Sequence, residues 1–234
     1  MKPIEIVITC EHGGNEVPLP YRALFQQAAT ELNSHRAIDF GAYGIACLIN
    51  KAYGFNFAYT LTSRLLIDCN RSLNHPKCFS EFTKSLSKIE KQQIIEQFYL
   101  PYRNQAEAYV KTHIEQGSQV LHISVHSFTP CLNGKTRNAA IGLLYDSKRH
   151  GEKEVARIWS SLLTKHPPSY RVRMNHPYRG ESDGLTCALR KKFPESQYLG
   201  IELELNQSIF DDADTSQELA EILIDTINDL LQVL

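Results

Sequence analysis

The sequence predicts an α/β fold in which helices cover a largely parallel or mixed β-sheet. Five short apolar runs bounded by turn residues recur along the chain, and the segments between them are long enough to hold helices. That alternation is typical of a sheet layered with helices. Because the chain has 234 residues, 42% of them hydrophobic, it can bury one sizeable core, and we expect residues 1–234 to form a single domain.

The apolar runs define the expected strands, which are residues 5–10, 55–61, 119–126, 139–145 and 198–205. The other long segments define the expected helices, which are residues 35–53, 87–116, 151–165 and 215–233. Two of these helices begin with the spacing of a capping box, Ser87 before Glu90 and Thr215 before Glu218. Pro101 is expected to divide or kink the second helix.

The overall charge favours a small-molecule partner. Lys and Arg number 25 against 26 Asp and Glu, so we do not expect the large basic face that binds nucleic acid or anionic lipid. The opening "MKPIEIVI" does not resemble a secretory signal, and no run approaches the roughly 18 apolar residues that cross a bilayer. We expect a soluble, cytoplasmic protein, whose six scattered cysteines are mostly reduced thiols.

Polar loops follow three of the expected strands. The segments "CNRSLNHPKCF", "HSFTPCLNGKTRN" and "MNHPYRGESDG" are rich in Asn, Gly and Pro and carry Arg and His. In open α/β sheets, ligands bind beyond the carboxyl ends of the strands. The chemistry of the protein is therefore expected where these loops meet.

His12 and Glu16 lie in "TCEHGGNEVP", directly after the first expected strand. Their spacing would put both side chains on one face of a helix, but Gly13 and Gly14 favour a turn that folds the chain back on itself. Either geometry can bring an imidazole and a carboxylate to one metal ion. The alternative is an ordinary turn with a solvated histidine and glutamate.

The run "VLHISVH" alternates apolar and polar residues, so His122, Ser124 and His126 share one face of a strand. His122 and His126 would lie about 13 Å apart at roughly 3.3 Å per residue, too far for both to bind one ion without a bend. His126 is nearer the carboxyl end of the strand and is the candidate ligand. His122 is expected to be an interior histidine with satisfied hydrogen bonds.

Glu202 and Glu204 share one face of the last expected strand, in "LGIELELNQ". Two carboxylates in an apolar strand are costly to bury unless they are paired, hydrogen-bonded or metal-bound. Glu204 is therefore a candidate general base near a metal ion, with Glu202 as a partner that orients it. The alternative is that this face is exposed at the edge of the sheet.

Arginines flank an acid and an amide in "SRLLIDCNR". Arg64 and Arg71 can each bind a carboxylate through two parallel hydrogen bonds, and Asn70 supplies a further donor. The same run can equally be a structural cluster in which Asp68 pairs with one of the arginines.

Six segments, in this order, resemble the N-formylglutamate amidohydrolase family: "CEHGGNEVP", "AIDFGA", "SRLLIDCNR", "HSFTP", "NHPYRGESDG" and "IELELNQ". They span residues 10–207, most of the chain. The family is similar in design to the zinc carboxypeptidases and to the aspartoacylase and succinylglutamate desuccinylase group. The resemblance implies the fold of that group, a three-layer α/β/α sandwich around a mixed, largely parallel sheet.

The resemblance implies that His12, Glu16 and His126 are the ligands of one zinc ion. Two histidines, one carboxylate and an open fourth position are typical of catalytic zinc. Gly13 and Gly14 would then let the loop turn tightly enough for two of the ligands to reach the ion. Iron, cobalt or manganese could occupy the same ligands. One departure is that the related carboxypeptidase pattern spaces its first His and Glu by three residues, whereas this chain spaces them by four.

The catalytic roles also follow from the resemblance. Glu204 would take a proton from the zinc-bound water and return it to the departing amine. Arg64 resembles the arginine that stabilises the oxyanion. Asn70 and Arg71 resemble the Asn-Arg pair that binds the carboxylate of the substrate.

Two further segments contribute candidate residues. Tyr178 and Arg179 are expected to contact the substrate from a loop over the pocket, although the loop composition also suits a surface turn. Asp39 is expected to orient a ligand histidine through a hydrogen bond, without itself binding the metal. The alternative for Asp39 is a surface pair with His35 or Arg36 on its own helix.

The expected function is a zinc-dependent amidohydrolase that removes a small acyl group, such as formyl, from the nitrogen of an acidic amino acid. A carboxypeptidase-like enzyme or another N-acyl amino acid hydrolase is a second interpretation. A third is a binding module that keeps the fold without turnover, and a fourth is a metal-free protein in which the three ligands never converge.

Overall fold

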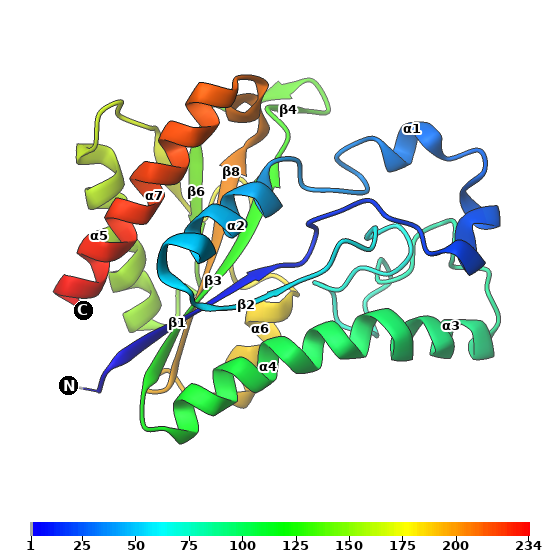
Figure 1. The fold of residues 1–234 in the computed structure, drawn as a ribbon, viewed down its shortest axis with the longest axis horizontal. Helices are drawn as coiled ribbons and strands as arrows, with labels where there is room; N and C mark the ends of the chain where they lie inside the picture. Colours follow the sequence, from blue (N-terminus) through cyan, green and yellow to red (C-terminus); the bar gives the residue numbers. More distant parts are fainter. Residues whose placement is uncertain (1) are drawn as a thin grey trace.

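The computed structural model describes residues 2–234 and contains a six-stranded sheet between two layers of helices (Figure 1). The strand order is β2-β1-β3-β8-β6-β7. The strands are β1 (Ile4–Cys10), β2 (Asn56–Tyr59), β3 (Gln119–Phe128), β6 (Ile141–Leu144), β7 (Val172–Met174) and β8 (Tyr198–Asn206). A separate hairpin pairs β4 (Cys131–Leu132) with β5 (Lys135–Thr136).

The sheet is mixed and mostly parallel. β2, β1, β3 and β8 run parallel to one another, whereas β6 is antiparallel to β8 and parallel to β7. The carboxyl ends of β1, β3 and β8 therefore meet at one edge of the sheet, where a ligand is expected to bind. The predicted three-layer α/β/α fold is confirmed.

Helices cover both faces of the sheet (Figure 1). The helices are α1 (Ala29–Leu32), α2 (Ala42–Tyr53), α3 (Lys88–Ile94), α4 (Leu100–Glu115), α5 (His150–Lys165), α6 (Leu185–Lys192) and α7 (Ala213–Val233). α2, α5 and α7 pack on one face, and α4 and α6 pack on the other. Two 3-10 segments, Leu19–Phe25 and Gln207–Asp211, lie in the connections.

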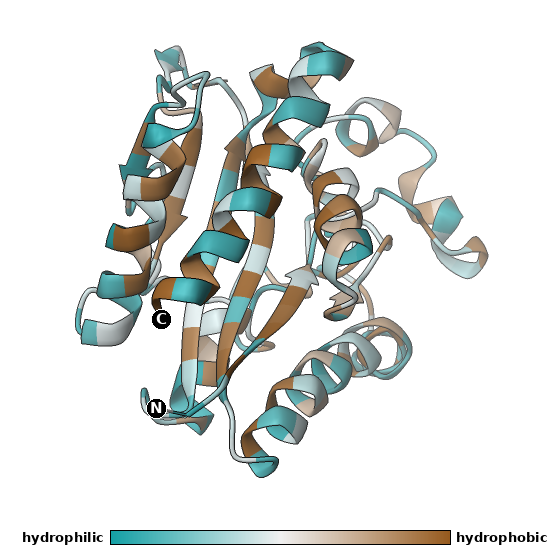
Figure 2. Cartoon of the chain, turned by 60° about the vertical axis from the view of Figure 1, so that its left-hand side comes forward, coloured by the Kyte–Doolittle hydropathy of each residue, from teal (hydrophilic) through white to brown (hydrophobic). Residues whose placement is uncertain are grey.

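The core is split into two apolar layers because successive strand residues point to opposite faces. Ile123 and Leu203 pack with Trp159 in the layer beneath α2, α5 and α7, while Val120 packs with Tyr102 in the layer beneath α4. The apolar stripes of the helices face the sheet (Figure 2). Burying each large apolar side chain contributes about 1.5–3 kcal/mol, so these layers hold the strands that carry the polar residues in place.

α2 begins later, and α7 begins earlier, than the sequence predicts. α2 begins at Ala42, after Gly41 with φ 78°, so residues 35–41 form a loop and not the first turns of a helix. α7 begins at Ala213, because the carboxylate of Asp212 accepts a hydrogen bond from the backbone of Thr215 at 2.8 Å. The expected cap at Thr215 is therefore wrong, since this residue lies inside the first turn.

The expected helix over residues 87–116 begins as predicted, with a capping box in which Ser87 and Glu90 bond each other's backbone. Pro101 does not divide it. A π-helical turn, Ile95–Tyr99, joins α3 to α4 directly before the proline, so the hydrogen-bond register changes where a donor is missing.

Several short elements are absent from the sequence prediction, and β7 and α6 illustrate why. β7 has only three residues and lies at the edge of the sheet, too short for an alternating pattern to identify it. α6 follows the loop "RGESDG", and its first backbone N–H, from Leu185, donates to the side chain of Asn70 at 2.7 Å. Because the capping residue lies far away in the chain, no local signal marks this helix start.

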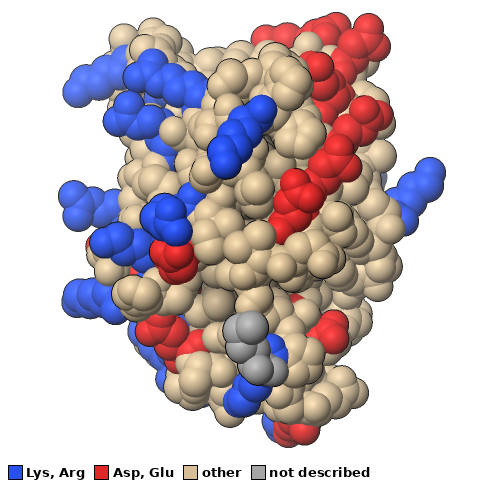
Figure 3. Space-filling view, turned by 90° about the vertical axis from the view of Figure 1, so that its left-hand side faces the viewer, with Lys and Arg blue, Asp and Glu red and all other residues tan. Residues whose placement is uncertain are grey.

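The remaining global predictions concern charge, cysteines and membrane crossing. Acidic side chains gather along the side of the molecule where α7 lies, and basic side chains gather on the opposite side of the same view (Figure 3). All six cysteines are free thiols. Within residues 2–234, none of the helices combines the length and the apolar character needed to cross a bilayer.

Candidate metal centre and substrate pocket

A cavity of about 530 Å³ opens at the carboxyl ends of β1, β3 and β8. Every predicted site residue except Glu16 lines it: His12, Asp39, Arg64, Asn70, Arg71, His126, Tyr178, Arg179, Glu202 and Glu204. These side chains come from the carboxyl ends of β1, β3 and β8 and from three loops that lie far apart in the sequence. The fold therefore assembles them into one pocket.

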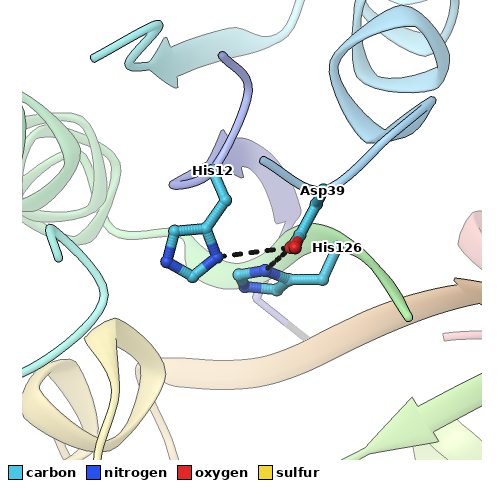
Figure 4. Close-up of side chains that lie close together, drawn as sticks. All are labelled: His12, Asp39 and His126. Carbon is cyan, nitrogen blue, oxygen red and sulfur yellow. Dashed lines mark hydrogen bonds and ion pairs between the residues drawn. The ribbon is translucent and has the colours of Figure 1, made fainter. Parts of the chain in front are cut away.

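Three residues that line this pocket, His12, Asp39 and His126, bring three ligand atoms together (Figure 4). Asp39 Oδ2 lies 3.3 Å from Nδ1 of His12 and 2.9 Å from Nδ1 of His126. Ligand atoms around a tetrahedral zinc ion are about 3.3 Å apart, given bonds of about 2.0–2.1 Å. The group could hold one such ion with little rearrangement.

Three elements position this group. His12 follows β1, His126 lies in β3, and Asp39 lies in the loop before α2. The backbone N–H of Asp39 donates to the carbonyl of His12 at 3.0 Å, which ties the two loops together. All three residues are at most 5% exposed. The late start of α2 matters here, because a helix over residues 35–41 would preclude this loop.

Each histidine also contacts a second buried carboxylate through its other ring nitrogen. His12 Nε2 lies 2.8 Å from Asp68 Oδ1, and His126 Nε2 lies 3.1 Å from Glu11 Oε2. Metal-binding histidines commonly donate the opposite N–H to a carboxylate, which fixes the orientation of the ring. The contacts of both histidines match that arrangement, with Nδ1 directed toward Asp39.

The buried carboxylates around His12 and His126 create a negative environment that favours a bound cation. Burial alone would lower the pKa of His126, but hydrogen bonds and attraction from Asp39 and Glu11 raise it well above its usual value. Burial raises the pKa of Asp68, but His12 and nearby arginines outweigh it and lower the pKa to about 2. A proton on His126 thus balances the carboxylates, and metal binding would release it.

Glu204 lies beside this group, on the neighbouring strand. Its Cα is paired with that of His126 across β3 and β8. The side chain is 5% exposed, and its Oε2 is buried without a hydrogen-bond partner. Burial, opposed in part by His126, raises the pKa of Glu204 to about 8. A carboxyl group in this state can hold or accept a proton near neutral pH.

Glu202 and His122, on the polar faces of β8 and β3, have hydrogen-bond partners inside the protein. Glu202 accepts a hydrogen bond from Thr186, and burial raises its pKa. His122 is fully buried between the hydroxyls of Thr9 and Tyr198, at 2.8 and 2.6 Å, and burial lowers its pKa to about 4. His122 is thus an interior histidine with both ring nitrogens satisfied, as predicted.

Glu16 is not part of the metal group. Its side chain is exposed and lines separate cavities, and its backbone N–H donates to Leu61 O at 2.9 Å. Gly14 serves this close approach, because a Cβ atom there would overlap the carbonyl of Leu61. The glycines therefore pack the loop against residues 60–62 and do not fold Glu16 back toward His12. Asp39 occupies the place expected of Glu16.

Arg64 and Arg71 both contact acids. Arg64 donates to the second oxygen of Asp39, so Asp39 is bound on both sides. Arg71 Nε lies 3.9 Å from Asp68 and its Nη1 donates to the carbonyl of Asp183 at 2.5 Å. Residues 63–71 thus form a structural ion-pair cluster and also line the pocket. The structural and the substrate-binding interpretations of this segment are therefore compatible.

Tyr178 and Arg179 are exposed in a loop at the pocket wall. The guanidinium of Arg137 lies 5.1 Å from the ring centroid of Tyr178 and donates to its hydroxyl at 3.2 Å. Gly142 lets this loop approach the sheet, because a Cβ atom there would overlap the carbonyl of His176. The loop is therefore held both by its close contact with β6 and by the contact of Tyr178 with Arg137.

Comparison with known proteins assigns the chain to a family. A family model described as N-formylglutamate amidohydrolase matches residues 4–210. The chain belongs to this family. A gene product of Agrobacterium tumefaciens is similar in structure, with a TM-score of 0.84 and 25% identity over 98% of this chain and 91% of that chain. The fold also matches N-formylglutamate amidohydrolase from Ralstonia eutropha, with a TM-score of 0.71 and 16% identity over 100% of this chain and 96% of that chain. A search of curated proteins found no match.

Membership of the N-formylglutamate amidohydrolase family supports an amidohydrolase function for this pocket. Three contributions to the pocket were not predicted from the sequence, and one of them is the contact of Asp68 with His12 at 2.8 Å, because Asp68 was expected only as a partner of an arginine. Glu11 received no role, although a carboxylate directly before His12 at the end of an apolar strand is a signal for a buried partner. Arg137 was also missed, because its contact with Tyr178 depends on the placement of two loops.

Proposed function

We propose that the chain is a metal-dependent amidohydrolase that cleaves the acyl amide of an N-acyl amino acid. One observation carries the proposal: three convergent ligand atoms lie beside a buried carboxyl group in a cavity large enough for a small molecule. The family match supports hydrolysis of an amide. The expected substrate is an N-formyl or other short N-acyl derivative of an acidic amino acid.

His12, Asp39 and His126 would hold one divalent ion, with zinc favoured because two imidazoles and one carboxylate suit it. When bound, such an ion lowers the pKa of a water ligand and polarises a carbonyl group. Asp68 and Glu11 accept from the outer nitrogens of the two histidines and so keep their rings in place.

Glu204 is the proposed general base. Its partnerless oxygen and its raised pKa suit a group that takes a proton from water and later delivers it to the leaving nitrogen. Burial keeps bulk water away from this carboxyl, so the proton is retained between the two steps. Glu202 remains the proposed orienting partner, held by its hydrogen bond from Thr186.

Arg64 is proposed to stabilise the negative charge that develops on the carbonyl oxygen of the substrate. Asp39 holds one end of its guanidinium, which leaves other N–H donors for the substrate. Losing one such donor typically lowers the rate about 100 to 1000-fold. The ion pair with Asp39 also holds the guanidinium in the pocket, so little side-chain entropy is lost when the substrate binds.

The remaining polar residues of the pocket are proposed to bind the carboxylates of the substrate. Arg71 and Arg179 supply positive charge, and Asn70 can donate through its amide because its oxygen already caps α6. Tyr178 would close the pocket from its loop, where Arg137 supports it. These groups suit a small anionic substrate.

The test is release of free amino acid from N-formyl-L-glutamate by protein purified without chelator, with the metal content measured on the same sample. Turnover proportional to bound zinc, abolished by His126→Ala and unchanged by His150→Ala at an exposed position, would support the proposal. N-acetyl and N-succinyl substrates and N-acylated dipeptides should be compared in parallel. Zinc-loaded protein without activity on any of them would contradict it.

A further inference from the structure

Glu11 is a buried carboxylate next to the candidate metal centre. Its side chain is 0% exposed, and the residue directly follows the end of β1. Three hydroxyl groups donate to it: Thr9 at 2.7 Å and Tyr102 at 2.8 Å to Oε1, and Ser124 at 2.8 Å to Oε2. The imidazole of His126 lies 3.1 Å from Oε2. Among residues 2–234, His126 is the one side chain that forms an ion pair with Glu11.

The directions of these hydrogen bonds decide where the proton on His126 lies. A hydroxyl group has one proton, and Ser124 gives its proton to the carboxylate of Glu11. Ser124 must therefore accept the hydrogen bond that joins its oxygen to His126 Nε2 at 2.9 Å. Both acceptors near Nε2, Ser124 and Glu11, require a proton on that nitrogen. The lone pair of Nδ1 is then free to face the ion, on the side where Asp39 lies.

We propose that Glu11 is a positioning residue, which keeps the proton of His126 on Nε2 and thereby presents Nδ1 to the metal ion. The proposal rests on the metal centre of the proposed function. Glu11 does so by fixing the proton of Ser124 as well as by accepting from His126 directly. Its negative charge also makes the ring a stronger ligand.

A purely structural role is the alternative for Glu11, because it ties β1 to Tyr102 on α4 and to Ser124 on β3. The variant Glu11→Gln separates the two roles. An amide has one acceptor oxygen and one NH2 donor, so it cannot accept from all four present donors. An NH2 group directed at Ser124 and His126 favours an unprotonated Nε2, which moves the proton to Nδ1 and into competition with the metal.

The matched control is Tyr102→Phe. It removes one of the hydrogen bonds to Glu11 and the tie to α4, but it leaves the carboxylate beside Ser124 and His126. A structural role would be weakened by either variant. A positioning role is weakened only by Glu11→Gln.

The experiment is a zinc titration of the metal-free proteins against a competing chelator, with folding of each followed by circular dichroism. Loss of a carboxylate that orients a metal ligand typically costs about 10 to 100-fold in metal affinity. We expect a loss of that size for Glu11→Gln and an unchanged affinity for Tyr102→Phe. Equal affinities for Glu11→Gln and the unmodified protein, or equal losses for both variants, would overturn the proposal.

A second measurement needs no variant. Nitrogen-15 NMR of histidine-labelled, zinc-loaded protein should report His126 with a proton on Nε2 and the metal on Nδ1, and the reverse assignment would overturn the proposal. If the unmodified protein binds no zinc, Glu11 has nothing to position and both proposals fail. If zinc binds with this assignment but no N-acyl amino acid is hydrolysed, the role of Glu11 stands and the proposed function fails.

Discussion

Glu204→Gln should stabilise the metal-free protein and do so increasingly as the pH rises. Burial raises the pKa of Glu204 from 4.5 to about 8. The folded state therefore holds this proton more tightly than the unfolded chain does, so the contribution to stability is complete below pH 4.5 and is lost as the pH rises toward 8. A glutamine has the shape of the protonated glutamate but never ionises, so it escapes that loss.

The size of the effect follows from the two pKa values. At about 1.36 kcal/mol per pKa unit, ionisation of this carboxyl in the unfolded chain lowers the free energy of unfolding by about 1 kcal/mol at pH 5 and about 4 kcal/mol at pH 8. The stability gained by Glu204→Gln should grow accordingly. The assay is urea unfolding of both proteins in chelator at several pH values between 5 and 8.

The matched control is Glu218→Gln at an exposed position on α7. Its stability difference from the unmodified protein should stay small and independent of pH. If the stability difference between Glu204→Gln and the unmodified protein is also independent of pH from 5 to 8, the reasoning is refuted. The carboxyl would then ionise as easily in the folded protein as in the unfolded chain. The same variant should lose turnover while still binding metal, since it lacks the proposed base.

Three further changes test other parts of the molecule. Glu152→Ala should lower the free energy of unfolding in urea by about 3–5 kcal/mol, because it leaves the buried Arg190 without its partner at 2.9 Å. Gly142→Ala should raise KM in steady-state kinetics, because the added methyl group overlaps the carbonyl of His176 and displaces the pocket loop. Arg64→Lys should lower kcat at least about 100-fold with metal still bound, because the ammonium group cannot reproduce the guanidinium fork.

Two control variants accompany these changes. Glu154→Ala breaks an exposed pair with Arg157 and should leave stability nearly unchanged, so a loss equal to that of Glu152→Ala would count against the role of burial. Gly44→Ala meets no atom within 4 Å and should leave KM unchanged. A KM for Gly142→Ala equal to that of the unmodified protein would contradict the support assigned to the loop, and a kcat for Arg64→Lys within a few-fold would contradict the role of Arg64.

The features that depend on local periodicity were predictable from the sequence. The period of two along β3 and β8 assigned His126 and Glu204 to polar faces, and their strands proved to be neighbours in register. The same period correctly made His122 an interior residue. A strand pattern carries this information because side chains alternate regardless of what packs on them.

The features that depend on contacts between distant segments were not predictable. Asp39, and not Glu16, lies beside His12 and His126 because the chain does not become helical until after Gly41 and because the loop after His12 is bonded to Leu61. Neither event has a signal in a single sequence. The start of α6 escaped for the same reason, since its cap comes from Asn70, 115 residues away from Leu185.

We propose that His12, Asp39 and His126, and not Glu16, hold the metal ion. The most direct test is the zinc content of the unmodified protein, Asp39→Asn and Glu16→Gln after equilibration with the same limiting free zinc. We predict one ion per chain for the unmodified protein and for Glu16→Gln, and a large loss for Asp39→Asn. Retention of the ion by Asp39→Asn together with its loss from Glu16→Gln would contradict the account.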